Sequence, residues 1–128
     1  MVTPIYAGLL ALLFVVLSAR VIQMRVKAGV SLGTGENRDL LRRQRVHGNF
    51  AEYVPFGLLL ILLMELRGLP DWSLHALGVL LVTSRVLYMI ALRGPKEVNK
   101  VRVAAMVCTF AVLVFGALGC LVPLGAAS

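Results

Sequence analysis

Arg45, Asn49 and Glu52 follow one another at intervals of four and three residues, just before a long apolar stretch. On a helix this spacing places them on one stripe, and Arg42 lies one turn earlier on the same side. Arginine presents a planar fork to carboxylates, and a fixed glutamate can hold an ammonium group. The stripe is therefore suited to a small zwitterionic ligand that carries several carboxylates.

Glu52 would lie at membrane depth if the apolar stretch crosses a bilayer. Glu52 and Glu65 are 13 positions apart, which is roughly 20 Å of helix, whereas the hydrocarbon core is about 30 Å thick. Because Arg67 and Asp71 follow Glu65 closely, we expect that end to be in water and Glu52 to be immersed. An ionisable residue in a membrane helix is a candidate for function, with a partner nearby.

Arg85 reaches a similar depth in the third apolar segment. It precedes Arg93 by eight residues, or about 12 Å of helix. Glu52 follows Arg45 by seven residues, or about 10 Å. Two interpretations stay open. The polar residues form a ligand site, or Glu52 and Arg85 tie two helices together while Asn49 bonds across the interface.

Four further side chains near this layer allow more than one role. The rings of Tyr53 and Tyr88 suit a headgroup layer, but their hydroxyl groups could also bind an anion beside arginines. We favour Tyr88 as a binding residue because it lies one turn from Arg85. His47 points away from the polar stripe on a regular helix, and the long stem of Arg20 allows its charge to reach the interface. The sequence leaves the roles of His47 and Arg20 open.

The composition is that of an integral membrane protein. The chain has 128 residues, of which 59% are hydrophobic, and a mean hydropathy of +0.89. We therefore predict an all-α, four-helix membrane bundle that forms a single domain over residues 1–128. The second helix is expected to begin at Arg38, outside the bilayer, and to end near Arg67. The segments long enough to cross, at about 20 residues each, are residues 4–24, 45–66, 72–92 and 101–122.

The basic residues are concentrated in two of the three connections. Seven lie between Arg20 and Arg45 against two acids, and four lie in residues 93–102 against one acid. The turn at residues 65–71 has one basic residue and two acids. The positive-inside bias then places the first and third connections in the cytoplasm and both termini on the other side. Since membrane topology accounts for the charge of +7, we expect no nucleic-acid partner.

The sequence predicts no metal site. His47 and His75 belong to opposite ends of the expected bundle, so they cannot share a metal ion within one subunit. No spacing of Cys and His residues in the chain is typical of a zinc site.

The stretch from Arg45 to Pro55 resembles the membrane-associated proteins in eicosanoid and glutathione metabolism, the MAPEG family. It carries the pattern Arg-x-x-x-Asn-x-x-Glu-x-x-Pro at the start of a second membrane helix. The similarity extends over residues 85–88 and the start of the fourth helix at Arg102, so it covers essentially the whole chain. The likeness is to the small bacterial members, which implies the bacterial inner membrane.

This resemblance implies a homotrimer of four-helix bundles that binds glutathione between neighbouring subunits, near the cytoplasmic face. Arg102 aligns with the family's arginine that faces the glutathione sulfur and would be the catalytic activator. The residues that would line the glutathione pocket are Arg25, Arg42, Arg45, His47, Asn49, Glu52, Tyr53 and Tyr88.

The function implied is that of a glutathione transferase or peroxidase. The glutathione thiolate would attack a lipophilic electrophile or hydroperoxide that arrives through the membrane. A guanidinium in a poorly hydrated pocket lowers the pKa of a thiol and favours this thiolate. The eicosanoid branch often has a second tyrosine one turn after the first, where this chain has Leu92. That difference argues against a leukotriene synthase, and the second substrate stays unspecified.

Two other functions stay open. Four short helices with one immersed carboxylate resemble small proton-coupled multidrug transporters. Those transporters carry the acid in the first helix, and the first helix here has none. The chain could also be a non-catalytic membrane assembly protein that uses the polar layer only to hold subunits together.

Overall fold

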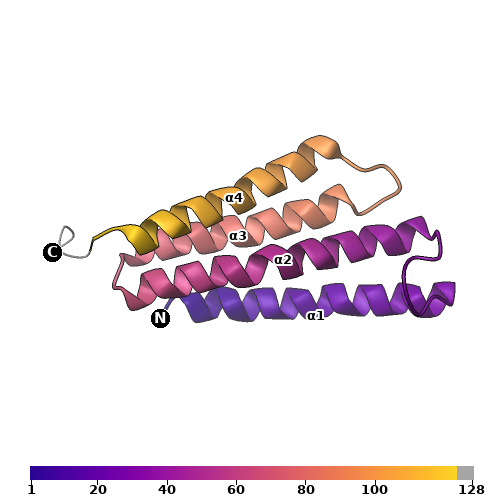
Figure 1. The fold of residues 1–128 in the computed structure, drawn as a ribbon, viewed down its shortest axis with the longest axis horizontal. Coiled ribbons are helices and arrows are strands. Elements are labelled where there is room, and N and C mark those ends of the chain that lie inside the picture. The colour runs from indigo at the N-terminus through magenta and orange to yellow at the C-terminus, as the bar shows by residue number, and fades with distance from the viewer. Residues whose placement is uncertain (124–128) are drawn as a thin grey trace.

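A computed structural model describes residues 1–123, which fold into four antiparallel α-helices (Figure 1). All four are long and apolar enough to cross a membrane. The predicted all-α membrane bundle is therefore confirmed, and each predicted span falls within one helix or overruns it by one residue. The helices are α1 (Thr3–Ala28), α2 (Arg38–Leu66), α3 (Asp71–Ala91) and α4 (Asn99–Leu121).

The bundle has two ends of different construction. The N-terminus, the short turn at residues 67–70 and the end of α4 lie together at one end, which we call the terminal end (Figure 1). The longer connections, residues 29–37 and 92–98, lie at the opposite end, the loop end. The predicted site residues of α2 and α4 belong to the loop half of the bundle.

Local signals fix the connection between α1 and α2. Gly29 follows α1 with φ of 69°, a left-handed conformation that glycine adopts at little cost, and the N–H of Val30 donates to the Arg25 carbonyl at 3.0 Å. Asn37 caps α2, because its side-chain oxygen accepts a hydrogen bond from the Leu40 N–H at 2.8 Å. These two caps define where α1 ends and where the basic helix α2 begins.

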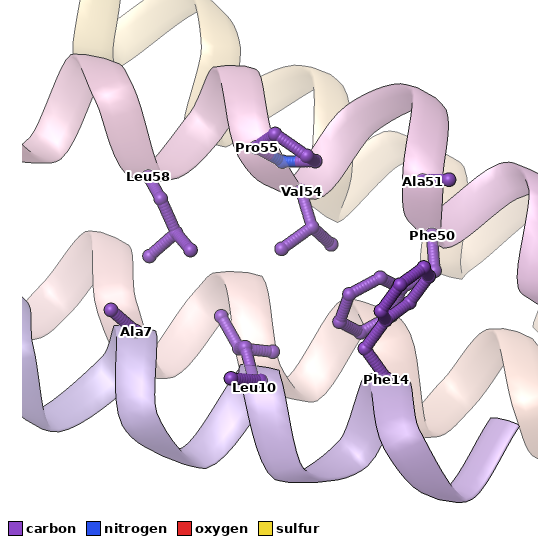
Figure 2. Close-up of a pocket in the computed structure, with 9 residues that line it drawn as sticks. Ala7, Leu10, Phe14, Phe50, Ala51, Val54, Pro55 and Leu58 are labelled. Atoms are coloured by element: carbon purple, nitrogen blue, oxygen red, sulfur yellow. The ribbon is translucent and has the colours of Figure 1, made fainter. Parts of the chain in front are cut away.

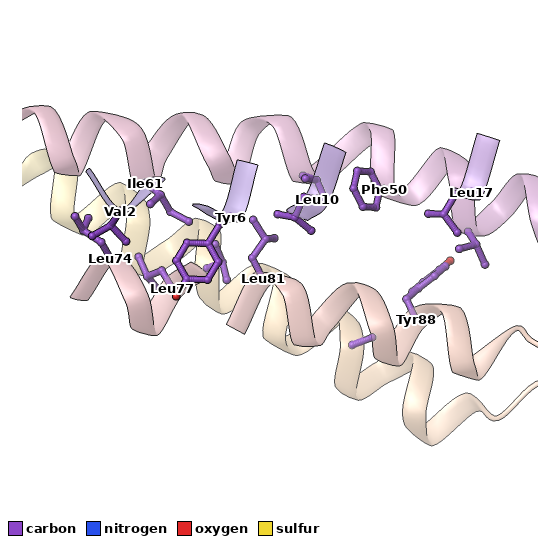
Figure 3. Close-up of a cluster of buried hydrophobic side chains, with 14 of the residues drawn as sticks. Val2, Tyr6, Leu10, Leu17, Phe50, Ile61, Leu74, Leu77, Leu81 and Tyr88 are labelled. Carbon is purple, nitrogen blue, oxygen red and sulfur yellow. The ribbon is translucent and has the colours of Figure 1, made fainter. Parts of the chain in front are cut away.

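The interior of the bundle is a continuous apolar core (Figure 3). Leu10, Val54, Ile61, Leu81 and Val112 are each at most 2% exposed. Many large apolar side chains instead face outward, as expected where lipid replaces water. The outward residues include Leu12, Val15, Ile22, Val107, Val114 and Phe115.

Glycines let the helices approach closely. A Cβ on Gly78 would lie 2.5 Å from the ring of Tyr6, so α3 has a notch that receives this ring from α1. On α4, a Cβ on Gly116 would lie 3.0 Å from Leu60 of α2. Small residues at such contacts strengthen helix packing in membranes, where the hydrophobic effect between helices is absent.

The charges at the terminal end are used within the chain. Glu65 accepts hydrogen bonds from the backbone N–H groups of Val2 and Thr3, so it neutralises the positive end of α1. Arg67 donates to three carbonyl groups that end α4. Those carbonyl groups belong to Gly119, Cys120 and Val122.

Aromatic residues also mark the terminal end. The hydroxyl of Tyr6 lies 2.7 Å from Nδ1 of His75. Trp72, at the start of α3, is 73% exposed and suits the membrane interface predicted for this end.

Candidate functional site

An arginine-rich groove lies at the loop end, between the first turns of α2 and the start of α4. Its volume is about 310 Å³, which is at the lower limit for small-molecule sites. Four guanidinium groups and one carboxylate line it. The lining residues are Arg38, Leu41, Arg42, Arg45, Leu92, Glu97 and Arg102.

A second groove continues from the first along α2. Arg45 lines both, so they share a wall. This second groove has a volume of about 260 Å³ and contains the whole stripe that the sequence spacing predicted. Its lining residues are Gln44, Arg45, Gly48, Asn49 and Glu52.

A third groove follows α4 and is mostly apolar. Arg102 lines both it and the arginine-rich groove, and its volume is about 390 Å³. Arg45 and Arg102 therefore each stand where the arginine-rich groove meets one of the other two grooves. The third groove is lined by Asn99, Arg102, Val103, Met106, Val107 and Phe110.

Two acids of the loop end, Glu97 and Asp39, pair with other arginines. Glu97 lies 4.0 Å from Arg38. Asp39 lies 3.7 Å from Arg42 and 3.6 Å from Arg43. Within residues 1–123, neither Arg45 nor Arg102 has a carboxylate oxygen within 4.0 Å. The grooves therefore present positive charge that the described chain does not balance, which favours an anionic ligand.

Arg85 lies inside the bundle and is 3% exposed. Its guanidinium donates to the side-chain oxygens of Asn49 on α2 and Thr109 on α4, and its Nε donates to Oγ of Ser84 at 3.1 Å. These neutral oxygens satisfy the buried guanidinium and join α2, α3 and α4.

One of the two open interpretations tied Glu52 to Arg85, but within residues 1–123 no ion pair joins them. Glu52 is exposed on the outer face of α2. Equal depth along the axis did not place the two side chains on facing surfaces. The expected bond of Asn49 across the helix interface is present, with Arg85 as its donor.

Tyr88 connects Arg85 to the grooves. Its side chain is buried at 2% exposure, near the loop end of the core (Figure 3). The guanidinium carbon of Arg85 lies 5.6 Å from the centre of its ring, and that of Arg102 lies 5.9 Å from it. Both distances fit cation–π contacts. Tyr53, half-buried on α2, packs edge-on against Phe110 in the wall of the third groove.

Four of the predicted pocket residues line none of these grooves. Tyr53 and Tyr88 contact groove residues, as described above, whereas the contacts of His47 and Arg25 are with other parts of the chain. His47 faces α1, where Nε2 is 3.0 Å from Oγ of Ser18 and the ring stacks on Phe14. Arg25 holds the first connection, because it donates to the carbonyl of Gly33 at 2.9 Å. A single subunit therefore groups the other six predicted binding residues with Arg102, and the binding roles of Arg25 and His47 stay predictions.

Arg20 also faces the inside of the loop end. It lines a small polar space with Asp39 and Arg43, and its backbone carbonyl accepts a hydrogen bond from Arg43 at 2.8 Å. This contact links the end of α1 to the start of α2.

A separate apolar cavity of about 240 Å³ opens between α1 and α2 (Figure 2). None of the predicted binding residues lines it, and Figure 2 shows the rings of Phe14 and Phe50 at one side. The polar stripe of α2 and this cavity thus lie on different faces of the same helix. The cavity is lined by Ala7, Leu10, Ala11, Phe14, Phe50, Ala51, Val54, Pro55 and Leu58.

Two contributors were missed from the sequence. Arg38 lines the arginine-rich groove, although the sequence assigned it only to the part of α2 outside the membrane. Its spacing of four residues before Arg42 could have placed it on the same stripe. Thr109 binds Arg85, and a hydroxyl in the otherwise apolar part of α4 after Arg102 was the available signal.

Comparison with known proteins gives a family for the chain and two relatives. The chain is 36% identical over 88 residues to the inner membrane protein YecN of Escherichia coli K12, a match that covers 69% of the chain and 67% of YecN. The same identity and coverage hold for YecN of Escherichia coli O6:H1. No solved structure matches the chain. The profile of the MAPEG family matches residues 3–122, which include all four helices and every groove residue described above, so this chain belongs to the MAPEG family.

Proposed function

We propose that this protein is a glutathione-binding membrane enzyme, a transferase or peroxidase that activates the glutathione thiol for attack on a lipophilic substrate. Family membership supports a role related to glutathione. The similarity to inner membrane proteins supports the bacterial inner membrane as its location. The basic connections support a topology with the grooves near the cytoplasmic face.

The observation that carries this proposal is the pair Arg45 and Arg102. Both line the arginine-rich groove, and within residues 1–123 neither is paired with a carboxylate. Glutathione has two carboxylates, one ammonium group and one thiol. Arg45 and Arg42 can bind carboxylates through bidentate hydrogen bonds, and Glu52, in the adjoining groove, can bind the ammonium group.

Arg102 is proposed to act on the sulfur. It lines the polar groove and the apolar groove, so a thiol beside it would face both compartments. A neighbouring guanidinium favours the thiolate by lowering the thiol pKa. In a transferase reaction with a chlorinated dinitrobenzene, the thiolate forms a carbon–sulfur bond at the ring, chloride leaves with the bonding electrons, and the thiol proton passes to solvent.

A hydroperoxide would react at the same sulfur. The thiolate attacks the outer oxygen, the oxygen–oxygen bond breaks, and the alkoxide leaving group takes a proton to become an alcohol. A second glutathione then converts the sulfenic acid to the disulfide and releases water. Val103, Val107 and Phe110 provide an apolar wall beside Arg102 for either lipophilic substrate.

Arg25 and His47 support a site shared between subunits of a homotrimer. Neither of them lines a groove of its own chain. A ligand that they contact as well as Arg102 would have to lie between two copies. Crosslinking or native mass spectrometry in detergent would test the trimer directly.

The decisive experiment compares Arg102→Ala with Arg93→Ala. Both changes remove one positive charge at the loop end, but Arg93 lines none of the three grooves. Purified protein is titrated with glutathione while the ultraviolet absorbance of the thiolate and the conjugation of the chlorinated substrate are followed. We expect Arg102→Ala to reduce conjugation by about 100-fold or more and to abolish the thiolate signal, with Arg93→Ala close to the wild type.

Two results would refute the proposal. One is the absence of saturable glutathione binding by the wild-type protein. The other is equal activity and equal thiolate absorbance for Arg102→Ala and Arg93→Ala.

A further inference from the structure

The contact between Arg85 and Asn49 determines which way the Asn49 amide points. A guanidinium has only hydrogen-bond donors, so the atom of Asn49 that faces Arg85 must be the oxygen. The hydrogen bond from Arg85 to Oδ1 of Asn49 fits this requirement. The two N–H bonds of the amide are therefore directed away from Arg85.

The NH₂ group of Asn49 has donor capacity to spare. Its partner in the structure is Sδ of Met106, at 3.5 Å. A thioether is a weak acceptor, and one sulfur cannot satisfy two N–H groups. A stronger acceptor that enters this region can therefore replace the sulfur at little cost.

This NH₂ group and its sulfur partner belong to grooves that Arg45 and Arg102 also line. Asn49 lines the second groove together with Arg45. Met106 lines the third groove together with Arg102. An N–H donor held here can form a directed hydrogen bond to an anionic ligand, in addition to the attraction of the ligand to the two arginines.

We propose that Arg85 is a positioning residue: it holds the Asn49 amide with its NH₂ group toward the grooves, so that Asn49 donates to a carboxylate of the bound ligand. This inference rests on the proposed glutathione function for the identity of the ligand. Arg85 itself does not contact the ligand, because it is buried and all its described contacts are internal.

The surroundings of Arg85 suit a rigid support. Ser84 and Thr109 accept two of its hydrogen bonds, and the Tyr88 ring lies beside its guanidinium. Thr109 in turn donates to the carbonyl of Ala105 at 2.9 Å, which fixes the hydroxyl. These contacts give the other two nitrogens of the guanidinium an acceptor each, and its bond to Asn49 is the contact that reaches α2.

The orientation can be measured in the wild-type protein without any ligand. Isotope labelling of asparagine and methionine in detergent-solubilised protein would allow nuclear Overhauser effects to be recorded between the Asn49 NH₂ protons and the Met106 methyl group. We expect this signal in the wild type and in Thr109→Val, and its loss in Arg85→Met. Its absence from the wild type would overturn the proposal, whether or not any variant folds.

Thr109→Val is the matched control. It removes the other cross-helix partner of Arg85 but leaves the Asn49 bond in place. A purely structural Arg85 would make Arg85→Met and Thr109→Val alike in glutathione affinity once both are folded. We expect Arg85→Met to raise the glutathione Kd by about tenfold, the scale of one hydrogen bond to a charged group, and Thr109→Val to leave it within about twofold.

Arg85→Lys tests whether any donor at this position orients the Asn49 amide or whether the shape of the guanidinium is needed. Lysine is also only a donor, so it should retain the amide orientation and recover most of the affinity that Arg85→Met loses. In a double-mutant cycle, Arg85→Met should have no further effect once Asn49→Ala has been made. Additive effects, or a Kd for Arg85→Met equal to that of Thr109→Val, would overturn the proposal.

A failure of the proposed function gives a different pattern. If the wild type does not bind glutathione, the proposed function is wrong. The claim that Asn49 donates to a carboxylate of glutathione is then wrong as well. The nuclear Overhauser measurement still decides whether Arg85 controls the amide.

Discussion

The two ends of the bundle use their charged residues in opposite ways. At the terminal end, Glu65 binds the first backbone N–H groups of α1, and Arg67 binds the last carbonyl groups of α4. At the loop end, Arg45 and Arg102 line grooves and have no carboxylate partner within residues 1–123. The terminal end uses these charges to complete the fold, whereas the loop end, besides its internal contacts, keeps two charges available at the grooves.

This difference separates stability from binding within a small chain. A helix end needs partners for its free backbone groups, and a charged side chain provides strong ones. An arginine that faces a groove contributes little to folding, because its charge is solvated in the free protein. Substitutions at the two ends should therefore affect different measurements.

Arg67→Met should give the largest loss of stability. Three carbonyl groups at the end of α4 lose a charged donor, and we expect about 2–3 kcal/mol of destabilisation. Thermal unfolding in a fixed detergent would measure it. Glutathione affinity of the folded fraction should not change, and a lowered affinity would break the separation between the ends.

Glu65→Gln should give a smaller loss of stability than Arg67→Met. The amide oxygen can still accept a hydrogen bond from the N–H of Val2 or Thr3, but the negative charge at the start of α1 is lost. The midpoint of thermal unfolding should fall, and hydrogen exchange should speed up in the first turn of α1. Unchanged exchange there would show that the carboxylate does not cap this helix.

Arg45→Met should have the smallest effect on stability and a clear effect on binding. Arg45 is exposed, and it has no carboxylate partner in residues 1–123, so we expect a change within about 0.5 kcal/mol. The glutathione Kd, measured by calorimetric titration, should rise by about tenfold, and its dependence on salt should weaken. A large loss of stability would mean that Arg45 belongs to the fold and not to a site.

The sequence was sufficient to predict the helices and to place three polar residues of α2 on one surface. Apolar length determined the four spans, and the spacing of Arg45, Asn49 and Glu52 correctly placed them on one surface, the second groove. These features follow from distances along a single helix.

The pairing of side chains between helices could not be predicted in the same way. Counting residues gave Glu52 and Arg85 similar depths but not the rotation of α2 and α3 about their axes. That rotation turns Asn49 toward Arg85 and leaves Glu52 exposed. Thr109 was missed for the same reason, because its role depends on the face of α4 that meets α3.

The exposed position of Trp72 has a practical consequence. It is the one tryptophan in the chain, and it stands at the terminal end, far along α3 from Arg85 and Tyr88. Its fluorescence should therefore report on the surrounding lipid or detergent and stay constant while ligands fill the grooves. Trp72 fluorescence can therefore serve as an internal reference for changes in the tyrosine fluorescence of the loop end.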